Sequence, residues 1–229
     1  MSEGESVRVA VRVRPFNQRE KDRSSRLCIR MMDKTTTIVN PENEAEKNFT
    51  FDFSYWSHDG ARELENGYNE PAGPGMGTDG ATYADQAAVF NDLGKGVLNN
   101  AYEGFNSCLF AYGQTGSGKS YSMVGYGTNK GIVPVSCDAI FKKIDEMKAG
   151  PDGAKFQYQV TIQMLEIYNE QVRDLFAKTN PSGGLKVRMN PKSGVEVVGL
   201  SEWPVGSYKE IDERIDTATK NRTVAATQM

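Results

Sequence analysis

Cysteine and histidine are scarce in this chain, and that scarcity argues against several kinds of site. The 229 residues include three cysteines, Cys28, Cys108 and Cys137, and one histidine, His58. An odd number of cysteines without C-x-x-C spacing gives little support to a disulfide framework or a zinc site. We therefore expect buried, reduced thiols that act as small hydrophobes, and we interpret the lone histidine, in its polar surroundings, as incidental.

A surplus of positive charge is also missing. Lys and Arg total 27 against 30 Asp and Glu, a formal net charge of −3, which disfavours non-specific coating of nucleic acid. No apolar run approaches the ~20 residues that cross a bilayer, and the acidic start at residues 1–5 is unlike a secretory signal. A charged share of 25% and a hydrophobic share of 38% instead indicate an ordinary globular protein, and the few cysteines, without disulfide spacing, favour the cytoplasm.

The hydrophobic pattern changes between strand and helix periods along the chain. Val7–Arg14 and Lys47–Tyr55 alternate apolar and polar residues and predict strands, whereas Asp85–Tyr102 and Ile132–Lys148 carry apolar residues at helical spacing. Strands that alternate with helices predict the α/β class, with a central, mostly β sheet flanked by helices. Because we find no internal repeat and no sharp change in composition, we expect a single domain over residues 1–229.

Other stretches add detail to this organisation. Residues 65–80 are rich in Gly, Pro and Asn and predict a flexible surface insertion. Residues 156–167 alternate and predict one long strand, and residues 185–198 predict a small hairpin lobe around a Pro- and Gly-containing turn. Ser207 and Glu210 have the spacing of a capping box, which predicts the start of a last helix.

The strongest chemical signal is a phosphate-binding loop. A short apolar run, Ser107–Tyr112, predicts a buried central strand and leads directly into the pattern G-x-x-x-x-G-K-[ST]. Glycines let the backbone wrap a polyphosphate and aim its N–H groups inward, and the following helix adds its N-terminal donors. Lysine supplies charge for the terminal phosphates, and the serine hydroxyl is a ligand for Mg²⁺. The loop consists of Gly113, Gln114, Thr115, Gly116, Ser117, Gly118, Lys119 and Ser120.

A complete nucleotide hydrolase also needs an Asp at the end of a second apolar strand to hold Mg²⁺. Asp52 lies inside a run that continues with Phe53, and Asp138 and Asp174 fall in stretches that we interpret as helical. The second half of a hydrolytic site is therefore not found, and no catalytic residue is assigned within these residues.

The loop and its neighbours resemble the kinesin motor domain. Ala101–Tyr112, which runs into the loop, is similar to the core signature of that family. Three further stretches match in the same order: Val9–Phe16, Leu165–Leu175 and Asn221–Thr227. The stretch Phe51–His58 is similar to the transport-type third class of kinesins. The resemblance implies the P-loop NTPase-like fold of a kinesin motor, and Leu165–Leu175 is interpreted as scaffold, a strand followed by a short helix.

The resemblance implies ATP or ADP with Mg²⁺ as cofactors. It places Arg12, Arg14 and Pro15 against one side of the adenine and stacks Tyr121 on the other, while the loop from Gln114 to Ser120 holds the phosphates. An aromatic ring and a guanidinium plane suit a nucleobase. Without the resemblance, a solvated strand face remains the alternative for the two arginines.

The resemblance also implies a microtubule partner and a place on the cytoskeleton. The hairpin lobe aligns with a lobe that contacts tubulin in kinesins, where Lys186, Arg188 and Lys192 would meet an acidic surface. A plain solvated hairpin is the alternative for each of these residues.

The family's switch I would begin just after Met229, so the resemblance implies a motor domain that is incomplete at its C-terminus. The switches, the main microtubule-binding helix and the neck linker are not found, which predicts nucleotide binding without turnover at a motor's rate. A natural non-hydrolysing module and a truncated gene product both remain alternatives to a working motor. Direction, cargo, velocity and oligomeric state are left open.

Overall fold

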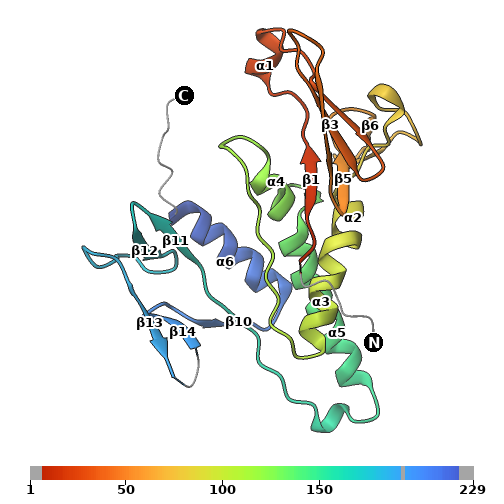
Figure 1. The fold of residues 1–229 in the computed structure, drawn as a ribbon. Helices are drawn as coiled ribbons and strands as arrows, with labels where there is room; N and C mark the ends of the chain where they lie inside the picture. The colour runs from red at the N-terminus through yellow and green to blue at the C-terminus, as the bar shows by residue number, and fades with distance from the viewer. Residues whose placement is uncertain (1–6, 192–193, 222–229) are drawn as a thin grey trace. The chain divides into compact units, whose positions relative to one another are not determined.

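The computed structural model describes residues 7–191 and 194–221, and the chain divides into two compact units. The division falls between Ser136 and Cys137, inside helix α5 (Ile132–Ala149). As predicted, α5 carries Pro134 in its first turn and Gly150 just beyond its end, the positions at which helices best tolerate these residues. Within the described residues the strands form seven small sheets rather than one continuous sheet (Figure 1).

The first unit is organised around a parallel pair of strands, β1 (Ala10–Val13) and β5 (Phe53–Trp56), which lie side by side in Figure 1. The predicted strand over residues 47–55 is wrong as one continuous element, because it breaks at Asp52. The Asp52 carboxylate accepts the N–H of Val9 at 2.7 Å, and the N–H of Asp52 donates to the Val9 carbonyl at 3.0 Å. These two hydrogen bonds hold Asp52 against Val9, the residue just before β1.

An antiparallel three-stranded sheet precedes β5 in the chain. Its order is β2-β3-β4, and a short helix, α1, comes just before it. Helix α1 begins with a capping box, in which Asn17 accepts from the Glu20 N–H and the Glu20 carboxylate accepts from the Asn17 N–H. The bounds are α1 (Gln18–Asp22), β2 (Ile29–Met32), β3 (Thr35–Val39) and β4 (Glu46–Thr50).

The stretch predicted as an insertion without regular structure is partly ordered. Strand β6 (Ala61–Glu63) pairs with β7 (Asn69–Pro71), and a single 3₁₀ turn, η1 (Thr78–Gly80), follows. Pro71 closes the hairpin, where its missing N–H costs little because the ladder ends there. The mobility of residues 65–80 stays a prediction.

The predicted helix after this hairpin is present but interrupted. It begins at the N-cap Asp85, whose carboxylate accepts the N–H of Ala88 at 2.8 Å. A π-helical turn containing Gly94 then separates two α-helical parts, as expected where a glycine weakens the middle of a helix. The bounds are α2 (Gln86–Val89), η2 (Phe90–Gly94) and α3 (Lys95–Tyr102).

The core of the first unit gathers around Tyr55, Val89 and Ile132, with Leu109 packed against it. The predicted strand at residues 107–112 is wrong, because this stretch forms no ladder in the described residues. Phe110 is 80% exposed and Tyr112 is 96% exposed. Only Leu109 reaches the core, so apolar composition overstated the burial of the stretch.

The second unit is built from hairpins and a closing helix. Strand β10 (Thr161–Ile162) pairs with β15 (Trp203–Pro204), and β11 (Leu165–Tyr168) pairs with β12 (Gln171–Asp174), all antiparallel. The predicted long strand over residues 156–167 is therefore wrong, because only its second half is extended and paired.

Two further interpretations of the second unit need correction. The stretch after Leu165 returns as strand β12 instead of a short helix, because Asn169 and Glu170 take left-handed backbone angles, φ 48° and 60°, that make a tight hairpin turn. Asp174 therefore ends a strand and is not helical, although it still lacks a following glycine. The three cysteines are free, but none is fully buried as predicted: Cys108 is exposed, and Cys28 and Cys137 are half-buried.

The predicted hairpin lobe and last helix are confirmed. Strands β13 (Lys186–Asn190) and β14 (Gly194–Val198) form an antiparallel pair, and α6 (Tyr208–Asn221) follows. The Ser207 hydroxyl accepts the Glu210 N–H at 3.3 Å, while the Glu210 carboxylate bonds the N–H of Gly206 rather than that of Ser207. The buried face of α6 consists of Ile211, Ile215 and Ala218.

Candidate functional site

The phosphate-loop sequence forms a turn that opens a short helix, α4 (Lys119–Met123). Gly118 is the N-cap of α4 with φ 98°, a left-handed backbone angle that favours glycine. The Lys119 side chain folds back over the loop, and its Nζ donates to the carbonyl of Gly113 at 2.7 Å and to that of Gln114 at 2.9 Å. The ammonium group therefore lies on the loop instead of extending into solvent.

Several backbone donors of this loop are unused. One internal bond, from the Ser117 N–H to the Gln114 carbonyl at 3.1 Å, closes the turn. Among the described residues, no acceptor takes the N–H groups of Gly116, Gly118 or Lys119. The Ser120 hydroxyl belongs to an exposed residue in the first turn of α4. Free N–H groups beside an ammonium can bind an anion, although five residues give α4 only a small dipole.

Arg14 connects this loop to helix α1. Its Nε donates to the Gly116 carbonyl at 2.6 Å, and its two terminal nitrogens each donate to a Glu20 carboxylate oxygen at 2.7 Å. Hydrogen bonds from Arg14 lower the pKa of Glu20 to about 2, and the same pairing raises the pKa of Arg14. Since its donors are engaged, Arg14 acts on the loop by fixing its position.

Arg12 is a second hub, held by neutral oxygens. Its Nε donates to Ser57 Oγ at 2.9 Å and its Nη1 to Gln86 Oε1 at 2.7 Å. It also bonds Ser122 Oγ at 3.1 Å and the Ala84 carbonyl at 3.2 Å. The guanidinium carbon lies 5.2 Å from the centre of the Tyr121 ring. Burial lowers the pKa of Arg12, and nearby Tyr121, Tyr83 and Asp85 counter that effect.

A cavity of about 410 Å³ lies beside the loop, wholly within the first unit. It brings together six of the residues that the sequence nominated, from two separate stretches of chain. These are Arg12, Arg14, Pro15, Ser117, Gly118 and Tyr121. The other nominated residues, Gln114, Thr115, Gly116, Lys119 and Ser120, belong to the loop itself and do not line the cavity.

The cavity has further walls that the sequence did not reveal, among them His58, Tyr83 and Asn69. Tyr83 is buried, and burial raises the pKa of its hydroxyl. Tyr83 and Asn69 belong to no motif. His58 ends the stretch Phe51–His58 and follows the strand that pairs with β1, so a parallel β1–β5 pair would place it next to Arg14.

A candidate magnesium site rests on one protein ligand. No group of three or more His, Cys, Asp or Glu side chains in the described part of the chain has the arrangement of a metal site. The exposed Ser120 hydroxyl is a hard oxygen donor, and Mg²⁺ commonly takes one or two protein oxygens together with phosphate oxygens and water. The residues present therefore fit an ion that arrives with a polyphosphate.

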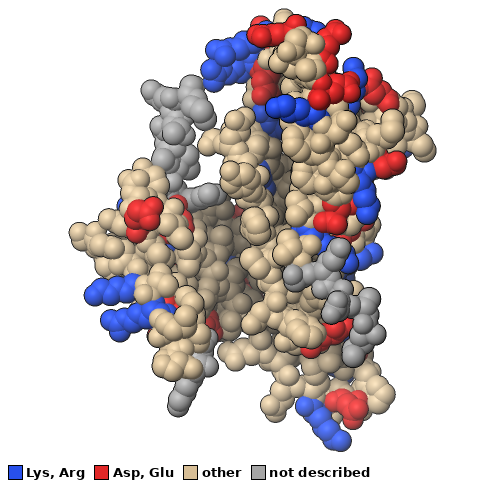
Figure 2. Space-filling model, in the orientation of Figure 1, with Lys and Arg blue, Asp and Glu red and all other residues tan. Residues whose placement is uncertain are grey.

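The basic residues nominated for a partner lie on the hairpin of the second unit. Lys186 and Arg188 are exposed on one face of β13, and Arg188 faces Glu196 across the pair. Basic side chains project from this hairpin in Figure 2. Lys192 lies outside the described residues. The opposite face is apolar and exposed, with Met189 at 74% and Val195 at 67% exposure.

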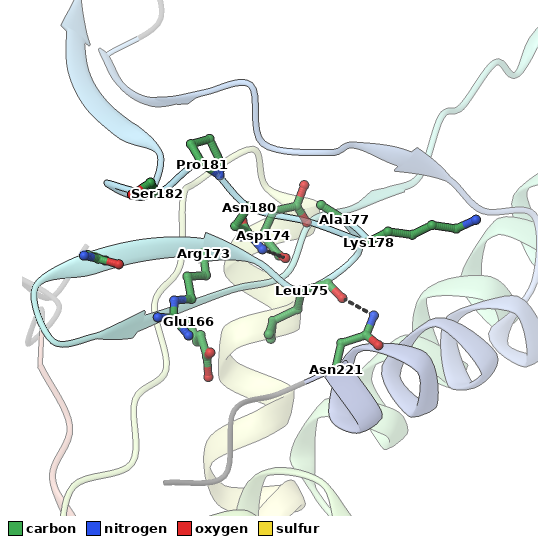
Figure 3. A pocket seen from close by; sticks show the side chains of 11 residues that line it. Glu166, Arg173, Asp174, Leu175, Ala177, Lys178, Asn180, Pro181, Ser182 and Asn221 are labelled. Atoms are coloured by element: carbon green, nitrogen blue, oxygen red, sulfur yellow. Dashed lines mark hydrogen bonds between the residues drawn. The ribbon is translucent and has the colours of Figure 1, made fainter.

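A second cavity, of about 390 Å³, lies in the second unit around β12 and the turn after it (Figure 3). Burial would raise the pKa of Asp174, but hydrogen bonds from Ser201 and from the N–H groups of Phe176 and Ala177 outweigh it and lower that pKa. Asn180 bonds the Asp174 backbone, and Asn221 donates to the Leu175 carbonyl at 2.9 Å. The hydrogen-bonding groups of Asp174 are therefore engaged in holding the turn that follows β12.

The loop has the sequence pattern and the left-handed glycine turn of the P-loop class, and the first cavity lies beside it. The chain belongs to the kinesin family: the kinesin motor domain model matches residues 12–229. The expected fold is confirmed by a solved structure of a KIF14 dimer with AMP-PNP in complex with a microtubule. It superposes with a TM-score of 0.81 at 34% identity, covering 98% of this chain and 57% of that one. A KIF14 complex with ADP and a microtubule gives 0.75 at 36% identity, with the same coverage.

Curated relatives agree. Kinesin-like protein KIF28 of Mus musculus is 46% identical over 98% of this chain and 21% of its own length. Kinesin-related protein 1 of Dictyostelium discoideum is 45% identical over 98% of this chain and 10% of its own length. Kinesin-like protein KIF1B of Homo sapiens is 44% identical over 99% of this chain and 12% of its own length. The chain thus spans between 10% and 21% of the length of these three. No helix among the described residues is long and apolar enough to cross a membrane.

Proposed function

We propose that this chain is the nucleotide-gripping part of an ATP-hydrolysing, microtubule-based motor. The observation that carries the proposal is the continuity of the Lys119 loop with the cavity lined by Arg12, Arg14, Pro15 and Tyr121. Such a layout has one end suited to phosphates and another suited to a base. Assignment to the transport-type third class stays a prediction, as does the single domain over residues 1–229.

Each part of the proposed site has a distinct task. The free N–H groups of Gly116, Gly118 and Lys119 bind phosphate oxygens, and Lys119 moves from its carbonyl partners to the terminal phosphates. Tyr121 offers its ring to the base. Ser120 would hold Mg²⁺, which when bound would neutralise charge on the phosphates. Arg12 and Arg14 hold the surrounding walls, because their donors are already engaged with protein oxygens.

The proposed partner is the microtubule, and the proposed location is the cytoskeleton within the cytoplasm. Support comes from the similar KIF14 structures, which contain a microtubule, and from the exposed Lys186 and Arg188 on hairpin β13–β14. Replacing both with Glu should weaken co-sedimentation with microtubules, most strongly at low salt. Unchanged co-sedimentation would remove the hairpin from the proposed interface.

Nucleotide binding is tested with Lys119→Ala. We expect the wild-type chain to bind a fluorescent ADP analogue with Mg²⁺, and the variant to lose affinity by tenfold or more, because a charged hydrogen bond contributes about 1.5–3 kcal/mol. Lys155→Ala is the matched control, since the Lys155 side chain is 87% exposed and lies outside the loop. Circular dichroism verifies folding.

Two results would count against the proposal. Equal affinity in wild type and Lys119→Ala would remove the loop from nucleotide binding. Robust microtubule-stimulated phosphate release by this chain alone would contradict the proposal that it is only the nucleotide-gripping part of the motor.

A further inference from the structure

His58, the single histidine of the chain, lies at the wall of the first cavity and is held there by two aromatic rings. Its ring centre is 4.7 Å from that of Phe16 in an edge-on arrangement, and 5.5 Å from that of Trp56. The packing fixes the plane of the imidazole at the cavity wall. A side chain held in this way can offer one defined atom to a bound molecule.

The hydrogen bond of His58 decides which atom that is. Its Nδ1 lies 3.1 Å from the carbonyl oxygen of Arg14. A carbonyl oxygen only accepts, so Nδ1 carries the hydrogen, and in the neutral ring Nε2 then has a lone pair and acts as an acceptor. In the described part of the chain, no donor satisfies Nε2.

The other polar groups of the cavity are less selective. Ser57 and Ser122 accept from Arg12, and the Ser57 hydroxyl also donates to the Ala84 carbonyl at 2.6 Å. The side-chain amide of Asn69 can donate or accept, so it satisfies either kind of base edge. The hydrogen of Ser57 is likewise engaged, but Ser57 already accepts from Arg12, whereas the Nε2 acceptor of His58 has no donor among the described residues.

We propose that Nε2 of His58 is a specificity-determining acceptor that favours a 6-amino purine over a 6-oxo purine. Adenine carries an amino group at this position, which donates a hydrogen bond to Nε2. Hypoxanthine carries a carbonyl oxygen there, whose lone pairs face the lone pair of Nε2. The inference rests on the proposed function, because it needs a purine nucleotide in this cavity.

The test compares ADP with inosine diphosphate, whose bases differ in the 6-substituent and the hydrogen at N1. The wild-type chain should bind ADP about tenfold more tightly than inosine diphosphate, because one hydrogen bond to the base is replaced by a repulsion between lone pairs. In His58→Asn the side-chain amide still reaches the Arg14 carbonyl, but no acceptor stands at Nε2. We expect this variant to bind both nucleotides within twofold of each other.

Two further variants distinguish recognition of the base by His58 from a purely structural role of this residue. His58→Gln can place an amide oxygen near the position of Nε2, and should restore most of the preference for ADP. Asn69→Ala is the control, and should weaken both nucleotides equally. A His58→Asn variant that keeps the full ADP preference, or loses affinity for both nucleotides in proportion, would overturn the role of His58. A wild-type chain that binds neither nucleotide would instead overturn the proposed function.

Discussion

Replacing Arg12 with lysine tests whether this residue supports the site or contacts the ligand. A lysine keeps the positive charge but has a single ammonium group. It cannot reproduce the four hydrogen bonds of 2.7–3.2 Å that the three nitrogens of the planar Arg12 guanidinium donate. The main cost falls on Gln86, which is 4% exposed and loses the donor to its Oε1. Its amide still donates to the carbonyls of Tyr121 and Asn129.

The magnitude follows from these contacts. A buried acceptor left without a donor costs about 1–3 kcal/mol, and each further bond lost costs about 0.5–1.5 kcal/mol. Because Arg12 is only partly buried and water can replace some bonds, we expect Arg12→Lys to lower the free energy of unfolding by about 3 kcal/mol. In a chain of this size that corresponds to a fall in Tm of about 6–12 °C.

Urea and thermal unfolding, followed by circular dichroism without nucleotide, measure this loss. Arg8→Lys is the matched control, since Arg8 is exposed near the start of the same strand and should change stability by less than about 0.5 kcal/mol. The reasoning is refuted if Arg12→Lys unfolds like wild type while its affinity for ADP collapses. That result would make Arg12 a ligand contact and not a structural hub.

Three other substitutions test separate features. Glu20→Gln removes the carboxylate that fixes Arg14, and should weaken ADP binding a few-fold in a titration while costing about 1 kcal/mol of stability, since both side chains are partly exposed. Gly125→Ala should lower the free energy of unfolding by about 2 kcal/mol or more, because φ is 76° and an added Cβ would overlap the Asn129 carbonyl. Asp174→Asn should destabilise the chain at neutral pH. Because the pKa of Asp174 is lowered in the folded state, this contribution is present above the ordinary value of 3.8 and is lost as pH falls through the folded pKa. The gap between wild type and Asp174→Asn in urea melts should therefore narrow only below about pH 4.

The features that were predictable from sequence are those that short stretches dictate. The loop at Gly113–Ser120 and the hairpin lobe at residues 185–198 follow from local turn chemistry, and α5 follows from its apolar stripe with Pro134 and Gly150 at its ends. The structure of residues 107–112 could not be predicted in this way. Apolar composition indicates that a segment prefers burial, but whether it forms a ladder depends on partners elsewhere in the chain.

The walls of the cavity show the same division. Arg12, Arg14, Pro15 and Tyr121 were found because they belong to recognisable stretches. From the sequence His58 is interpreted as incidental, whereas its ring packs against Trp56, two residues before it, and against Phe16, and it bonds the backbone of Arg14. Only the pairing of β5 with β1 creates that environment.

The position of Lys119 on the loop determines which anions the loop can bind. Its ammonium group already donates hydrogen bonds to two carbonyl oxygens. The net binding energy of an incoming anion is therefore its attraction to the ammonium group minus the energy of the two hydrogen bonds that it displaces. The attraction of a neutral or singly charged compound is too weak to displace these hydrogen bonds, whereas a di- or triphosphate brings several negative charges to the ammonium group. On the proposed function, we therefore expect this loop to bind di- and triphosphates in preference to singly charged anions.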